Sequence, residues 1–163
     1  DLNLTSKLQY GAQPLRREVC TAGPLLRQLA AQFYESPLCR TAELTLCQNE
    51  EAERAILSAD RALLGRLLEN LLNNSVRHNP QPVHIVVSTA VEGRRFCLTV
   101  ADDGDGYPPE VLAAQHAAEP GENAPHILGL HVVEQIAAAH GGQAVFGQNT
   151  AKGARTTIWL PLA

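Results

Sequence analysis

The stretch from Arg61 to His78 reads RALLGRLLENLLNNSVRH, and its apolar residues recur at the three- and four-residue spacing of an amphipathic helix. They form the wide stripe that a helix presents to a core: Leu63, Leu64, Leu67, Leu68, Leu71, Leu72 and Val76. Asp60 is placed to cap this helix, and Asn79-Pro80 ends it. The sequence therefore predicts a long helix packed along its leucine stripe.

Patterns typical of strands occur before and after this helix. Before it, Glu43–Cys47 alternates polar and apolar residues, and Arg54–Ser58 is a short strand candidate. After it, apolar runs flank two turns, at Glu92-Gly93 and Lys152-Gly153, which predicts a hairpin and a final pair of strands: Val83–Thr89 with Phe96–Ala101, and Gln143–Gly147 with Thr156–Leu160.

Two other stretches have helical spacing of apolar residues. The first is Pro24–Tyr34, and the second runs from Leu130 through Ala137 to a C-cap at Gly141-Gly142. Helices and strands do not alternate strictly, and hairpins stand beside helices. The pattern thus favours an α+β fold with its helices on one face of a sheet.

Composition limits the classes of function. The chain of 163 residues is 45% hydrophobic, which is ample for one domain with a sizeable core. A net charge of -4 and scattered arginines give no basic surface for nucleic acid, so we expect no such partner. The cysteines are far apart and lack metal-ligand spacing, which predicts reduced thiols: Cys20, Cys39, Cys47 and Cys97.

The chain also lacks any apolar run of the roughly 20 residues that cross a bilayer, so we expect no membrane contact from it. It begins at Asp1 and contains no methionine, which suggests a part of a longer polypeptide. Any membrane segment of that polypeptide would lie elsewhere.

Residues suited to chemistry lie together on the long helix. Asn70, Asn74 and Arg77 fall at i, i+4 and i+7, with His78 beside them. Asparagine is a poor interior helix residue because its amide competes with the backbone, so two on one face need a reason. One reason is plain exposure to solvent. The other is a site where the side-chain oxygen of Asn74 ligates Mg²⁺ and Arg77 meets phosphate.

A second group follows an apolar strand, in the segment Asp102-Asp103-Gly104-Asp105-Gly106. Its glycines permit close approach of a flat ligand, and a carboxylate there can accept a hydrogen bond from an amine such as adenine N6. A calcium loop is the rival interpretation. It is disfavoured because no glutamate stands at the EF-hand position and Pro108-Pro109 follows at once.

A third group, Leu128-Gly129-Leu130, is predicted to open a helix after a long loop from Tyr107 to Leu128. The exposed N–H groups of a helix start attract anions, and Gly129 would let phosphate approach. The alternative is a glycine that only marks where the helix begins.

Taken in order, these segments resemble the catalytic and ATP-binding domain of bacterial two-component sensor histidine kinases, in the GHKL (Bergerat-fold) superfamily. Asn70–His78 is similar to the N box, Asp102–Gly106 to the G1 box and Leu128–Leu130 to the end of the G2 box. Asp1–Leu15 is similar to the end of the dimerisation helix and its linker, which leaves 16–163 as the catalytic domain. The implied fold is a two-layer α/β sandwich, with a mixed, mostly antiparallel sheet of about five strands on about three helices.

The resemblance also implies roles for individual residues. Asp102 would bind adenine N6, and Asn74 would coordinate Mg²⁺. Asn70 and Arg77 would act in catalysis on the phosphate side of the pocket. The other implied nucleotide contacts are His78 near the phosphates, Gly104, Gly106 and Thr157 at the adenine, and Gly129 and Leu130 at the phosphate end of the lid.

Such a domain presents the γ-phosphate of ATP to a histidine on the dimerisation helices, and the phosphoryl group then passes to an aspartate of a response regulator. The implied parent protein is a homodimeric, ATP- and Mg²⁺-dependent histidine kinase, an inner-membrane sensor whose catalytic domain is cytoplasmic. The chain holds no candidate phosphoacceptor helix, so we do not expect it to phosphorylate itself.

Departures from the family pattern leave other functions open. From Tyr107 to Leu128 there is no lysine or arginine, and Pro125 and Ile127 replace G2-box glycines. The alternative is a degenerate signalling module that binds nucleotide or a partner protein with little or no kinase activity. A hydrolase of the superfamily is disfavoured, since Asn70 replaces its general-base glutamate and Glu69 lies about 100° around the helix.

Overall fold

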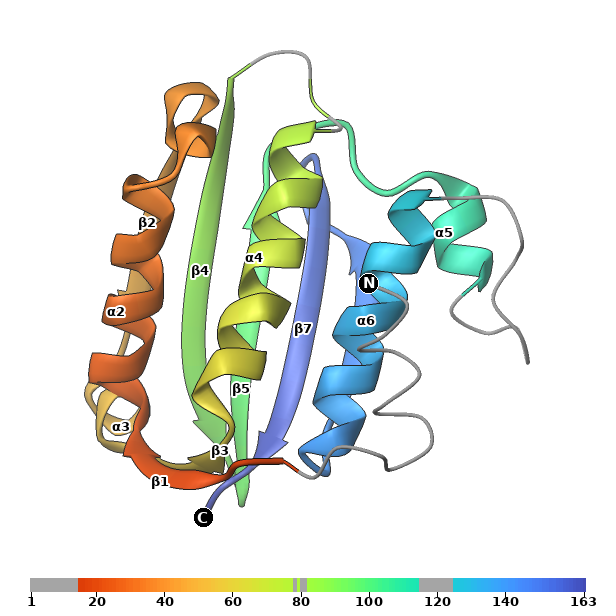
Figure 1. Cartoon of the computed structure of the whole chain (residues 1–163). Coiled ribbons are helices and arrows are strands. Elements are labelled where there is room, and N and C mark those ends of the chain that lie inside the picture. The colour runs from red at the N-terminus through yellow and green to blue at the C-terminus, as the bar shows by residue number, and fades with distance from the viewer. Residues whose placement is uncertain (1–14, 78, 80–81, 115–124) are drawn as a thin grey trace.

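The computed structural model describes residues 15–77, 79, 82–114 and 125–163. A five-stranded sheet forms one layer of the molecule and helices form the other (Figure 1). The strand order is β2, β4, β5, β7, β6, with bounds Ala42–Gln48, Val83–Glu92, Arg95–Asp102, Ala154–Pro161 and Gln143–Gln148. β2 and β4 are parallel and the other neighbours are antiparallel, so the sheet is mixed and mostly antiparallel, as predicted.

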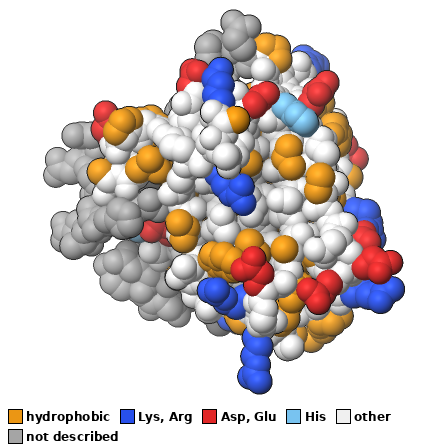
Figure 2. Space-filling view, turned by 180° about the vertical axis from the view of Figure 1, so that it is seen from behind, with side chains coloured by type: hydrophobic (Ala, Val, Ile, Leu, Met, Phe, Trp, Pro, Cys, Tyr) orange, Lys and Arg blue, Asp and Glu red, His pale blue; other side chains and the backbone are white. Residues whose placement is uncertain are grey.

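The helical layer consists of α2 (Ala22–Tyr34), α4 (Arg61–Arg77) and α6 (Pro125–Ala139), which lie side by side over one face of the sheet (Figure 1). The predicted α+β fold is therefore confirmed. The view from behind shows the opposite face, where hydrophobic side chains are scattered among charged ones (Figure 2).

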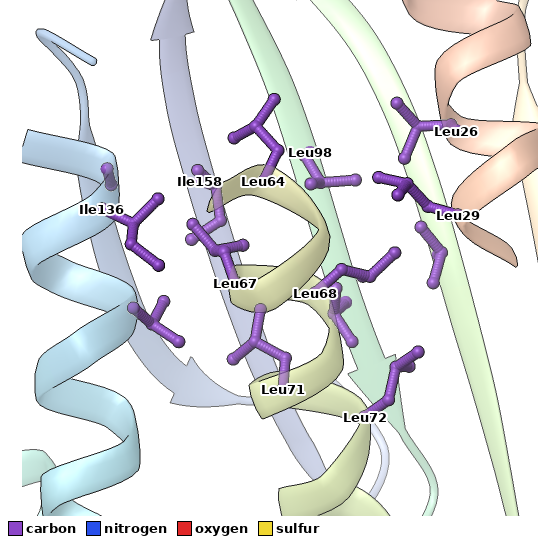
Figure 3. Packing of buried hydrophobic residues seen from close by; sticks show 14 of the residues in the cluster. Leu26, Leu29, Leu64, Leu67, Leu68, Leu71, Leu72, Leu98, Ile136 and Ile158 are labelled. Atoms are coloured by element: carbon purple, nitrogen blue, oxygen red, sulfur yellow. The ribbon is translucent and has the colours of Figure 1, made fainter. Parts of the chain in front are cut away.

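α4 occupies the middle of the helical layer, and its leucine stripe provides the centre of the core (Figure 3). The buried residues of the stripe are Leu64, Leu67, Leu68, Leu71 and Leu72. They share one cluster with side chains from α2, the sheet and α6, including Leu29, Leu98, Ile158 and Ile136. Asp60 caps the helix as predicted, because its Oδ1 accepts a hydrogen bond from the Leu63 N–H at 3.1 Å.

Several short elements were not predicted. They are β1 (Glu18–Thr21), which pairs antiparallel with β3 (Ile56–Ala59), the 3-10 helix η1 (Pro37–Thr41), and the helices α3 (Glu50–Arg54) and α5 (Pro109–Ala114). Arg54 therefore lies in a helix, and the strand predicted from Arg54 begins at Ile56. α3 forms here because its N-terminus is capped: the Asn49 side chain accepts a hydrogen bond from the Ala52 N–H at 2.8 Å.

The two ends of α6 differ in how well the sequence predicted them. At its C-terminus Gly141 has a φ of 79°, and the Gly142 N–H donates to the Ala137 carbonyl at 2.9 Å, which is the predicted glycine cap. The predicted start at Leu128–Leu130 is wrong, because the helix begins at Pro125. Proline is tolerated at a first helical position, where its missing N–H would have no partner.

All four cysteines are free thiols. None of the helices in the described ranges combines the length and the apolar character that a membrane span requires. The predicted boundary between linker and catalytic domain, at residues 15 and 16, adjoins residues 1–14, which lie outside the described part of the chain.

Candidate functional site

Asp102 is the last residue of β5 and is buried, with 4% of its surface exposed. Its Oδ2 accepts a hydrogen bond from Ser75 Oγ at 2.7 Å, and its Oδ1 accepts from the N–H groups of Gly104 and Ala154, both at 3.0 Å. An ionised carboxylate offers about four lone-pair sites, so one acceptor position remains. The carboxylate is thus fixed in place and can still accept a donor from a ligand.

The two glycines of the motif make room for neighbouring side chains. A Cβ on Gly104 would overlap the amide of Asn79, whose Oδ1 accepts from the Asp105 N–H at 2.9 Å. Gly106 has a φ of 86°, and a Cβ there would overlap Oε1 of Gln148. The groups that approach these two glycines closely are the protein's own amides. Approach by a flat ligand stays a prediction.

A pocket of about 30 Å³ lies beside Asp102. It is lined by Asn74, Ser75, Asn79, Asp102, Gly106, Tyr107, Pro108, Leu130 and Ala154. Nδ2 of Asn74 is buried and has no hydrogen-bond partner among the described residues. A buried polar group without a partner costs about 1–3 kcal/mol, which a bound acceptor would recover. Rotating this amide by half a turn instead presents Oδ1, an oxygen suited to a hard cation.

The remaining predicted site residues lie in different surroundings. Asn70 Nδ2 donates to the Gly129 carbonyl of α6 at 3.3 Å, so it ties the two helices together. Arg77 is exposed in the last turn of α4. Gly129 is inside α6 rather than at its N-terminus, while Leu130 lines the pocket. His78 lies outside the described residues.

The predicted adenine contact Thr157 lies on the wrong face of β7. Thr156 shares the helix-covered face with Ile158 and is 1% exposed, whereas Thr157 pairs with Thr99 on the opposite face. Successive side chains of a strand point to opposite faces, so a shift of one residue moves the side chain away from the pocket. Thr156 is the threonine on the pocket side.

Tyr107 also lines the pocket, although no sequence pattern selected it as a site residue. Its hydroxyl is hydrogen-bonded to Thr156 Oγ1, and its ring meets Phe146 edge-on with centroids 5.8 Å apart. Burial raises the pKa of Tyr107 to about 12, against the smaller lowering effect of the Thr156 bond. The phenol therefore stays protonated at neutral pH.

Ser75 and Asn79 were also missed as site residues. Ser75 continues the spacing of the leucine stripe, four residues after Leu71, so a hydroxyl at a core position was the available signal. Asn79 was predicted only as a helix stop, yet its Nδ2 donates to the Ser75 carbonyl at 2.6 Å. Its role depends on the turn at Gly104, which is distant in sequence.

Glu69 faces away from this pocket. It is exposed and lines a groove of about 640 Å³ between α2 and α4, together with residues such as Gln32 and Arg66. No carboxylate other than Asp102 lines the small pocket among the described residues, and Asp102 is already held by three donors. The arrangement suits recognition of a donor group and a cation more than activation of water.

A family model described as "Histidine kinase-, DNA gyrase B-, and HSP90-like ATPase" matches residues 59–163. Among curated proteins, the alginate biosynthesis sensor protein KinB of Pseudomonas aeruginosa is 29% identical over 171 aligned residues. The match covers 99% of the chain and 27% of KinB. The chain spans roughly a fifth to a quarter of the length of the first curated relatives that it matches.

Solved structures share the fold. The catalytic domain of the histidine kinase ThkA, in a nucleotide-free form, superposes with a TM-score of 0.75 at 18% identity, over 90% of this chain and 96% of that one. Full-length ShkA, solved in complex with AMPPNP, gives a TM-score of 0.78 at 24% identity, over 99% of this chain and 34% of that one.

Proposed function

The chain belongs to the family of histidine kinase-, DNA gyrase B- and HSP90-like ATPases, and from this premise we propose that it is the ATP-binding catalytic domain of a sensor histidine kinase. The observation that carries the proposal is the pairing, in one pocket, of the fixed Asp102 carboxylate with the unpartnered Asn74 amide. In this proposal the Asp102 carboxylate accepts a hydrogen bond from the base, and the Asn74 amide faces the phosphates and their cation.

The base end of the proposed site centres on Asp102. Its remaining acceptor position suits the exocyclic amine of adenine, which a guanine base lacks at that place. Tyr107 and Leu130 contribute apolar side chains to the lining, which also includes Gly106. The pocket holds about 30 Å³, which is room for a water or two rather than a purine. Entry of the base therefore requires the lining residues to move apart.

The phosphate end is assigned to α4. Asn74 would hold Mg²⁺ through its amide oxygen. The residue fits this role because an amide oxygen is a hard ligand, and because Nδ2, which has no partner among the described residues, can exchange places with Oδ1 when the amide is rotated by half a turn. When bound, the ion supplies positive charge that offsets the charge of the phosphates. Asn70 and Arg77 are the residues proposed to act on the transferred phosphoryl group, with Gly129 beside Asn70 and His78 next along the chain.

Transfer is favoured over hydrolysis because no free base lines the pocket within the part of the chain that the structure describes. Glu69 is directed to the groove between α2 and α4, and the residue at the expected position of the base is the amide Asn70. The acceptor is then a histidine on the dimerisation domain of the parent protein, followed by an aspartate of a response regulator. We place this chain on the cytoplasmic side of a homodimeric inner-membrane sensor.

A degenerate signalling module is the second candidate. It is favoured by the start of α6 at Pro125, four residues before Gly129, because the N–H groups of Gly129 and Leu130 are then inside the helix rather than free for phosphate. Such a module would bind ATP without transferring its γ-phosphate.

Labelling with [γ-³²P]ATP separates the two candidates. The 163-residue chain is mixed with the dimerisation helices of its own parent protein, and each is also tested alone. The kinase proposal expects acid-labile label on the helices only in the mixture, and none on the chain itself. ATP binding with no label in the mixture would favour the degenerate module.

A further inference from the structure

Gln148, the last residue of β6, holds the backbone of Tyr107 from both sides. Its Oε1 accepts a hydrogen bond from the Tyr107 N–H at 3.1 Å, and its Nε2 donates to the Tyr107 carbonyl at 2.8 Å. A side-chain amide can match a backbone amide in this way because both carry one donor and one acceptor at similar spacing. Residues 41 positions apart are thereby joined.

The backbone on either side is shaped to receive this amide. Gly106 adopts a φ of 86°, which favours glycine, and a Cβ there would overlap Gln148 Oε1. The Tyr107 side chain then reaches Thr156 and Phe146, so its ring lies between the sheet and the pocket. The position of the ring depends on a backbone that Gln148 fixes.

The next residue, Asn149, secures the other end of the segment that runs from Asp102 to Tyr107. Asn149 Nδ2 donates to the Asp102 carbonyl at 3.1 Å, and the Asn149 N–H donates to the Gly153 carbonyl at 2.7 Å. Gly153 packs so closely that a Cβ there would overlap the Asp102 carbonyl. The end of β6 therefore contacts the segment from Asp102 to Tyr107 at its last residue, through Gln148, and the turn that follows contacts it at its first, through Asn149 and Gly153.

We infer that Gln148 is a positioning residue for nucleotide binding, which shapes the base pocket by fixing Gly106 and Tyr107 opposite Asp102. This inference rests on the proposed function. Gln148 does not itself line the pocket among the described residues, so it acts through the two residues that do. Because it acts on the base end, ATP and ADP should depend on it equally.

The test compares Gln148→Leu with Gln143→Leu, an exposed position at the start of the same strand. Dissociation constants for ATP and ADP are measured by calorimetry on the 163-residue chain. Gln148→Leu loses two hydrogen bonds, so its dissociation constant for ATP should rise about tenfold, which corresponds to about 1.4 kcal/mol. The dissociation constant for ADP should rise by the same factor. Gln143→Leu should bind as the unmodified chain does.

A second variant separates positioning from general damage. Gln148→Glu keeps an acceptor for the Tyr107 N–H but, when ionised, sets a carboxylate oxygen against the Tyr107 carbonyl. Protonation of the new carboxyl group restores a donor, so the ratio of its ATP dissociation constant to that of the unmodified chain should shrink as the pH falls from 7 towards 5. A merely structural defect gives no such recovery.

The outcomes are distinct. If the unmodified chain binds ATP and both Gln148 variants bind ATP with the same dissociation constant as the unmodified chain, the inference is overturned while the proposed function stands. If the unmodified chain binds no ATP, the proposed function falls and the inference with it.

Discussion

Asp102 and Asn74, the two residues central to the nucleotide proposal, differ in whether their side-chain polar atoms have hydrogen-bond partners. The carboxylate of Asp102 accepts three hydrogen bonds, whereas Nδ2 of Asn74 has none within the described part of the chain. The first is arranged before any ligand binds, and the second is held at a cost in folding energy. Retaining an unsatisfied group in a pocket is typical of residues kept for binding rather than for stability.

Replacing Asn74 by leucine should therefore separate stability from binding. The substitution removes a buried amide with an unmet donor, which costs about 1–3 kcal/mol, so the variant without nucleotide should melt at a higher temperature. Its binding of ATP should be weaker and should no longer respond to Mg²⁺. Thermal unfolding and calorimetry with and without Mg²⁺ measure the two effects.

Asn73→Leu is the matched control, since it brings the same gain in helix propensity at the adjacent position. Asn73→Leu should leave the Mg²⁺ dependence of ATP binding unchanged. An Asn74→Leu variant that keeps wild-type Mg²⁺ dependence would argue against Asn74 as the ligand.

At the scale of elements, His140 joins the end of α6 to the start of α4. Its Nδ1 donates to the Ile136 carbonyl at 2.8 Å, and its Nε2 accepts from the Asp60 N–H at 3.0 Å. Nε2 can accept only while unprotonated, so the ring is neutral. Burial chiefly lowers the pKa of His140 from 6.5, helped by Arg17, against the opposing effects of the Ile136 carbonyl and Asp60.

This lowered pKa gives stability a definite pH dependence. Below about 6.5 the unfolded chain gains a proton at this histidine while the folded chain does not, so the free energy of unfolding decreases as the pH falls from there towards the folded pKa. Above 6.5 the contribution is fully present. Melting temperatures measured from pH 7.5 to 5.5 should fall more steeply for the unmodified chain than for His140→Gln, whose side chain does not titrate. Parallel curves would show that His140 is not the group responsible.

The sequence predicted best those elements whose signals are local. The leucine spacing of α4, the Asp60 cap and the Gly141 cap involve residues within a few positions of one another, and each was confirmed. The start of α6 and the short α5 were missed because proline and acidic residues in that stretch suggest a loop. The face of β7 on which Thr157 lies was not predicted, because strand register depends on pairing with β5, which is a nonlocal property.

At the scale of the whole molecule, the pocket is assembled from residues far apart in the chain. Ser75 of α4, Asp102 of β5 and Ala154 of β7 meet because α4 packs across the centre of the sheet. The sequence motifs selected Asp102 and Asn74 as candidates because both lie in short recognisable segments. Tyr107 and Gln148 carried no such signal, since their importance arises from contact across some 40 residues.

The central claim is that the pocket beside Asp102 receives the adenine of ATP. Calorimetric titration of ATP into the chain and into Asp102→Asn tests it most directly, with circular dichroism to verify that the variant is folded. The amide removes the charge and sets an NH₂ group among donors, so binding should weaken at least about tenfold. A folded Asp102→Asn variant with unchanged ATP affinity would contradict the account.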